Sequence, residues 1–135
     1  MTTIRVPVSV GELLDKVTIL ELKLRHIADP AKRANVAAEH AALEAIMAPL
    51  LQGAAPAVLA ALERLREVNA ALWRTEDEIR DCERRGEFGP AFVALARSVY
   101  VTNDERARLK RELSLLLGSE LVEEKSYTDY ARPPA

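Results

Sequence analysis

Apolar residues recur along most of the chain at alternating steps of three and four, the spacing that places side chains on one face of a helix. In the first such stretch they are Val10, Leu13, Val17, Leu20, Leu24 and Ile27. Ser9 stands just before this stretch and Glu12 follows three residues later, an arrangement typical of the capping box that begins a helix. The pattern predicts a helix over residues 9–28, preceded by an extended arm over residues 1–8.

A second helix is predicted over residues 30–51. Asp29 is a favourable N-cap and Pro30 is well tolerated at the first helical position. The apolar stripe of this segment includes His40, which is better explained as a packed, hydrogen-bonded side chain than as a metal ligand, because no Cys or second His accompanies it.

The two longest stripes lie on residues 56–85 and 90–117, and only residues 86–89 separate them. Two helices joined by so short a loop are expected to pack antiparallel. Residues 119–135 then form a C-terminal arm. The sequence therefore predicts one all-α domain over residues 1–135, a four-helix antiparallel bundle built from two helical hairpins, with short extended arms at both ends.

The unequal helix lengths predict self-association. Each of the first two helices would span roughly 30 Å, whereas the third would span roughly 45 Å at the usual rise per residue. The shorter hairpin cannot cover the longer one, and an exposed apolar stripe of that size usually meets a partner. We therefore expect a homo-oligomer, most simply a two-fold dimer.

Composition narrows the functional classes. The 135 residues are 49% hydrophobic and 30% charged, with a net charge of −2 and a pI near 5.8, which argues against a nucleic-acid partner. No apolar run approaches the roughly 20 residues of a membrane span, so no membrane insertion is expected. No secretory leader is recognised and Cys82 is the single cysteine, so we expect a cytoplasmic location.

Polar residues interrupt the stripes of the third and fourth helices. Antiparallel pairing about residues 86–89 places Asn69 opposite Arg106, and Glu76 can pair with Arg80 four residues later. Two interpretations of these groups are open: a device that fixes the register of the helices, or a polar pocket for a small ligand. The candidate ligand-binding residues are Asn69, Glu76, Arg80, Asn103, Arg106 and Lys110.

Other chemistry finds little support. Carboxylate pairs at three-residue spacing occur, and two such pairs on facing helices can hold a metal ion. No metal site is expected here, because no two of these pairs face each other. The sequence lacks a glycine-rich phosphate loop, a nucleophile elbow and a Cys-x-x-Cys pair, so no cofactor is expected. The carboxylate pairs are Glu12 with Asp15, Glu78 with Asp81, and Glu120 with Glu123.

Four segments resemble a small bacterial family known only as a domain of unknown function. They are residues 6–23 (VPVSVGELLDKVTILELK), 69–80 (NAALWRTEDEIR), parts of 97–112 (including NDER and KRE) and 118–127 (GSELVEEKSY). The resemblance implies a context in cell-envelope glycan assembly, because members of that family tend to lie near glycosyltransferase and surface-polysaccharide genes. It assigns no catalytic residue. It adds a second candidate patch, made of Asp15, Lys16, Glu124, Lys125 and Tyr127.

Two functions are compatible with these patterns. The first is a helical accessory or binding protein that acts with a protein partner in glycan assembly. The alternative is a small-ligand-binding protein or enzyme with its pocket between the third and fourth helices, for example one that hydrolyses nucleotides with a metal ion.

Overall fold

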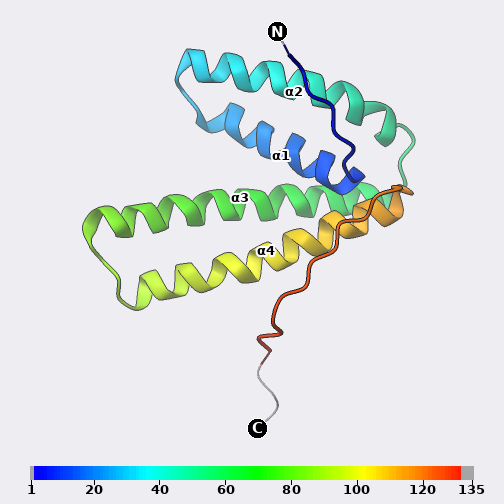
Figure 1. The fold of residues 1–135 in the computed structure, drawn as a ribbon. Coiled ribbons are helices and arrows are strands. Elements are labelled where there is room, and N and C mark those ends of the chain that lie inside the picture. Colours follow the sequence, from blue (N-terminus) through cyan, green and yellow to red (C-terminus); the bar gives the residue numbers. More distant parts are fainter. Residues whose placement is uncertain (1, 132–135) are drawn as a thin grey trace.

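The structure is a computed structural model that describes residues 2–131, and it confirms the predicted all-α fold. The helices are α1 (Val10–His26), α2 (Pro30–Leu51), α3 (Pro56–Arg85) and α4 (Pro90–Leu116). They form two antiparallel hairpins, α1–α2 and α3–α4, stacked one on the other (Figure 1). The described residues contain no strand.

The helix ends follow from the capping residues that the sequence displays. The Oγ of Ser9 accepts a hydrogen bond from the backbone N–H of Glu12 at 3.1 Å, and a carboxylate oxygen of Asp29 accepts one from Lys32 at 2.9 Å. Only half of the expected capping box forms, because the Glu12 side chain accepts a hydrogen bond from Lys110 instead. Gly86 ends α3 in the left-handed conformation, with φ of 68°.

The hydrophobic core lies where α1 crosses the first half of α3 and the second half of α4. α2 packs against α1 alone and has a single buried residue, Met47. Leu50, near the C-terminal end of α2, is 41% exposed. The core residues are Leu13, Leu14, Val17, Met47, Val58, Ala61, Leu62, Leu65, Leu109 and Leu113.

The expected mismatch in helix length is present. α1 has 17 residues and α2 has 22, whereas α3 has 30 and α4 has 27. The α3–α4 hairpin therefore extends beyond the α1–α2 hairpin at the loop between α3 and α4 (Figure 1). Phe88, Val93 and Val101, on this hairpin, are each about half exposed. None of the helices in residues 2–131 is both long and apolar enough to cross a membrane.

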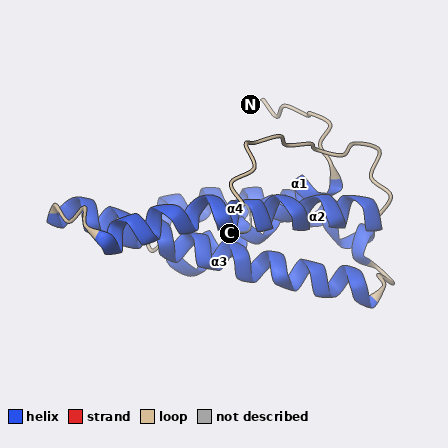
Figure 2. Ribbon diagram, turned by 90° about the horizontal axis from the view of Figure 1, so that it is seen from below, coloured by secondary structure: helices blue, strands red, loops and turns tan. Residues whose placement is uncertain are grey.

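Both arms lie on the same side of the helices (Figure 2). In the N-terminal arm Ile4 and Val6 are 81% and 67% exposed, so this segment packs against little. The C-terminal arm returns along α4, where the Tyr130 hydroxyl donates a hydrogen bond to Asp104 at 2.6 Å and its ring meets Tyr100 edge-on. Residues 1 and 132–135, the outer ends of the two predicted arms, lie outside the described residues.

Candidate functional site

Three helices meet at a buried polar cluster centred on Asp15 of α1. The Nε of Arg106, from α4, donates to Oδ1 of Asp15 at 2.9 Å, and its Nη2 donates to Oδ2. The amide nitrogen of Asn69, from α3, donates to Oδ1 of Asp15 at 2.9 Å and to the hydroxyl of Thr18 at 3.0 Å. A single carboxylate thus connects α1 to both helices of the longer hairpin.

The electrostatics of this cluster are balanced locally. Asp15 is only 1% exposed, and a carboxylate buried to that degree needs both an opposite charge and hydrogen bonds. Arg106 supplies both through its two parallel N–H donors. The hydrogen bond to Asp15 raises the pKa of Arg106 despite the partial burial of the guanidinium group. The guanidinium group of Arg106 is therefore charged in the folded protein.

Lys110 extends the cluster by one turn of α4. Its Nζ lies 2.5 Å from a carboxylate oxygen of Glu12, 3.3 Å from one of Glu123 and 3.9 Å from Oδ2 of Asp15. Burial by itself lowers the pKa of Lys110, but the hydrogen bond to Glu12 and the three nearby carboxylates outweigh it. The net result is a raised pKa, so the ammonium group is charged in the folded protein.

Lys110 should make stability fall at alkaline pH. Because its pKa is higher folded than unfolded, its contribution is complete below the unfolded value and is lost as pH rises through the folded value. We expect the unfolding free energy, measured by urea titration from pH 9 to pH 12, to decline less steeply in Lys110→Met than in the wild type. Lys16→Met, which removes an exposed lysine, is the control. Equal slopes for the two variants would contradict this role.

A cleft of about 460 Å³ opens beside the cluster, between α1, α3 and α4. Asn69 and Arg106 form part of its wall, and each keeps unused hydrogen-bonding capacity. Every fully buried side-chain nitrogen and oxygen of residues 2–131 has a partner, yet Oδ1 of Asn69 accepts no hydrogen bond there. This oxygen is therefore accessible from the cleft, although Asn69 is only 4% exposed as a whole. The Nη1 of Arg106 likewise has no partner within residues 2–131.

The remaining walls of the cleft combine an aromatic ring, apolar side chains and charged groups. The Trp73 ring stacks on the His26 ring with 5.0 Å between centroids. Glu76 and Arg80 form the expected ion pair along α3. The lining residues are Ile19, Leu22, Asn69, Leu72, Trp73, Glu76, Asp77, Arg80, Asn103 and Arg106.

Five of the six first-choice candidates thus line one cleft: Asn69, Glu76, Arg80, Asn103 and Arg106. Lys110 does not line it, and instead borders a different pocket one turn away. Asp15, the partner of Arg106, lies outside the α3 and α4 stripes and could not be predicted as that partner from them. The available signal was a second stripe on α1, where Gly11, Asp15, Thr18 and Leu22 are spaced by four, three and four residues, and all four are buried.

The second candidate patch does not form a single cluster. Asp15 belongs to the buried network, whereas Lys16 is exposed. Glu124 pairs with Arg111 at 2.9 Å, and Lys125 lies 3.9 Å from Glu123. Tyr127 is 75% exposed. Glu124 and Lys125 share the pocket that Lys110 borders, and Lys125 and Tyr127 together line a hollow between α4 and the arm.

The described residues contain no group of three or more His, Cys, Asp or Glu side chains arranged to hold a metal ion. No family model, curated protein or solved structure matches the chain. The site must therefore be interpreted from its own geometry.

Proposed function

We propose that the protein binds a small polar ligand in the cleft between α1, α3 and α4. The observation that carries this proposal is the carbonyl oxygen of Asn69, which opens into the cleft from an otherwise buried residue. The unused Nη1 donors of Arg106 stand on the same wall. Concave sites with apolar walls and a few oriented polar groups are typical of ligand-binding pockets.

The charges of the cleft favour a ligand with little net charge. Arg106 is already neutralised by Asp15, and Arg80 is neutralised by Glu76. A strongly anionic ligand would have to compete with these ion pairs and would also meet the carboxylate of Asp77, which lines the cleft and has no ion pair within residues 2–131. An uncharged ligand could instead donate to Asn69, accept from Arg106 and pack against Trp73 and Leu72.

Trp73 is the single tryptophan of the chain and lies in the wall, so its fluorescence reports on the cleft directly. We expect an uncharged member of a panel of monosaccharides, nucleosides, nucleotide sugars and divalent cations to change this fluorescence and raise the melting temperature. Asn103→Ala should weaken binding about tenfold, or about 1.4 kcal/mol, by removing a polar wall group.

Asn35→Ala is the matched control, because Asn35 is an exposed asparagine on α2, away from the cleft. It should bind as the wild type does. A panel without any response, or equal affinities for the two asparagine variants, would remove the proposal.

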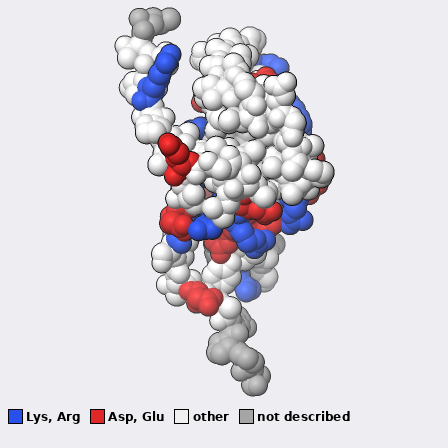
Figure 3. All heavy atoms as spheres, turned by 90° about the vertical axis from the view of Figure 1, so that its right-hand side faces the viewer, with Lys and Arg blue, Asp and Glu red and all other residues white. Residues whose placement is uncertain are grey.

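A separate observation favours the accessory role as a second candidate. Ile4, Val6 and Val8 of the N-terminal arm and Ile46 and Leu50 of α2 are all exposed apolar side chains. In the view of Figure 3 the surface over the α1–α2 hairpin carries few charged side chains, whereas charges gather in a belt below it. An uncharged, apolar surface of this kind suits a protein partner.

On this second proposal the protein is a cytoplasmic, dimeric accessory protein whose partner, following the family resemblance, is an enzyme of glycan assembly. Light scattering should then give the mass of a dimer. Immobilised protein should retain the partner enzyme, and Val6→Ser together with Ile46→Ser should reduce that retention. A monomeric mass with retention unchanged by these substitutions would argue against it.

A further inference from the structure

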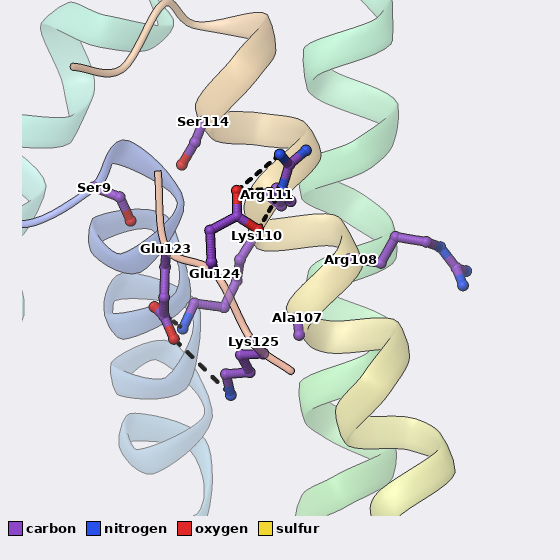
Figure 4. A pocket seen from close by; sticks show the side chains of 9 residues that line it. All are labelled: Ser9, Ala107, Arg108, Lys110, Arg111, Ser114, Glu123, Glu124 and Lys125. Atoms are coloured by element: carbon purple, nitrogen blue, oxygen red, sulfur yellow. Dashed lines mark hydrogen bonds and ion pairs between the residues drawn. The ribbon is translucent and has the colours of Figure 1, made fainter. Parts of the chain in front are cut away.

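A second pocket, of about 240 Å³, lies between the N-terminus of α1, the C-terminal half of α4 and the returning C-terminal arm. Figure 4 shows the arm passing between α1 and α4, with Glu123 and Glu124 directed toward Lys110 and Arg111. Ser9 and Ser114 complete the wall formed by the helices. This pocket is distinct from the cleft that Asn69 lines.

The helical wall of this pocket carries several hydrogen-bond donors, one of which, Lys110, also donates to Glu12 of α1 at 2.5 Å. The hydroxyl oxygens of Ser9 and Ser114 accept from the backbone N–H groups of Glu12 and Gly11, at 3.1 and 2.8 Å. Each hydroxyl proton therefore remains to be donated, and no atom in residues 2–131 accepts it. Ser114 is 1% exposed and Lys110 is 8% exposed, so the polar groups are built into the fold rather than scattered over its surface.

The carboxylates of the arm show that the helical wall of the pocket binds anionic groups. Oε1 of Glu124 accepts from Nη2 of Arg111 at 2.9 Å and Oε2 accepts from Nε at 3.4 Å, the side-by-side arrangement that arginine makes with carboxylates and phosphates. Glu123 accepts from Lys110 at 3.3 Å. The hydrogen bond with Arg111 lowers the pKa of Glu124, so this group is anionic at neutral pH.

Before Tyr130, whose hydroxyl donates a hydrogen bond to Asp104, the arm has few buried contacts. Its ion pair with Arg111 is solvent-exposed, and exposed pairs of this kind contribute little to stability. Leu121 and Tyr127 are 45% and 75% exposed, so the arm buries little apolar surface. A segment with few buried contacts opens locally at a low free-energy cost. An anion of higher charge density than a carboxylate can therefore replace the arm.

We infer that this pocket is a phosphate-binding site, in which Ser9, Ser114, Lys110 and Arg111 bind the phosphoryl group of a ligand. The carboxylates of Glu123 and Glu124 occupy the site when the ligand is absent and act as a tethered competitor. The ligand binds only to molecules in which the arm is released. The apparent affinity is therefore the intrinsic affinity multiplied by the fraction of such molecules.

The test uses pyrophosphate as the probe, with isothermal titration calorimetry on the full chain at constant ionic strength and pH 7.5. Relative to the wild type, E123Q with E124Q should bind about tenfold more tightly, because the competing charges are removed. Arg111→Gln should bind at least about tenfold more weakly. Both changes lie at exposed side chains, so the fold should be retained.

Arg84→Gln is the matched control, because it removes an exposed, ion-paired arginine at the far end of α3. It should leave pyrophosphate binding unchanged. The proposal would be overturned if the Arg84 and Arg111 variants bound pyrophosphate with equal affinity. It would also be overturned if E123Q with E124Q bound pyrophosphate no more tightly than the wild type. The proposal would also be overturned if the variant E123Q with E124Q bound a peptide of residues 120–125 but not pyrophosphate. The pocket would then select acidic peptides rather than phosphate. Asn103→Ala should have no effect here, which separates this site from the cleft.

Discussion

Gly11→Ala should be among the most destabilising single substitutions in the protein. A Cβ atom at position 11 would lie 2.0 Å from the carbonyl oxygen of Lys110 and 2.8 Å from Oγ of Ser114. Both atoms belong to the facing helix, α4, and the first is backbone, so no side-chain rotation can relieve the clash. α1 and α4 would have to separate, and the hydrogen bond from Gly11 to Ser114 would lengthen or break.

The magnitude follows from two opposing effects. Alanine is favoured over glycine in a helix by about 1 kcal/mol. Forcing an extra carbon into a close-packed contact costs about 1–3 kcal/mol, and more where backbone must move. We expect a net loss of at least about 2 kcal/mol in the unfolding free energy, measured by urea denaturation with circular dichroism.

Gly89→Ala serves as the control for Gly11→Ala. Gly89 has a negative φ, and a Cβ there would meet nothing within 4 Å, so the change should stay within about 1 kcal/mol. If both glycine variants are equally stable, the close approach of α1 to α4 is not a feature of the folded protein.

The positions of the four helices could be predicted from sequence because the signals are local. Each helix has a heptad stripe, and its ends carry residues such as Ser9, Asp29 and Gly86 whose side chain or backbone freedom acts within a few residues. The pairing of α3 with α4 also follows, because a short loop leaves two helices few ways to pack.

The placement of α1 on the longer hairpin could not be predicted in the same way. Its decisive contacts join residues about a hundred positions apart, as between Gly11 and Ser114. One stripe was sufficient to predict the helix, but α1 contacts three other helices and needs more than one buried face. Gly11, Asp15 and Thr18 lie on that second face, and their small or polar character conceals it from a count of apolar residues.

The same limitation explains the mixed result for the candidate site. Asn69, Glu76 and Arg106 were identifiable because they interrupt regular stripes, and the helical hairpin brings them to one cleft. The attachment of the arm to α4 depends on side-chain ion pairs at exposed positions such as Arg111, which leave no periodic signal.

Asp15→Ala should have the largest effect among the polar substitutions. It would leave the partly buried Arg106 without its carboxylate and remove one of the two acceptors of the buried Asn69 amide. Removing one partner of a buried ion pair typically costs about 3–5 kcal/mol. We expect a loss in that range, measured by urea denaturation.

A double-mutant cycle can then separate the ion pair from other effects of truncation. Arg106→Ala should also be destabilising, and the double variant should lose less than the sum of the two, by about 2 kcal/mol, because neither charge is then left unpaired. The exposed pair of Glu76 and Arg80 provides a cycle for comparison, and its coupling should not exceed about 0.5 kcal/mol.

Arg106→Met tests the two interpretations of the cluster against each other. If that variant is as stable as the wild type and still binds the ligand of the cleft, Arg106 neither stabilises the packing of the three helices nor binds the ligand. Loss of stability with retained binding would make the ion pair a device that sets the register of α1 on the longer hairpin.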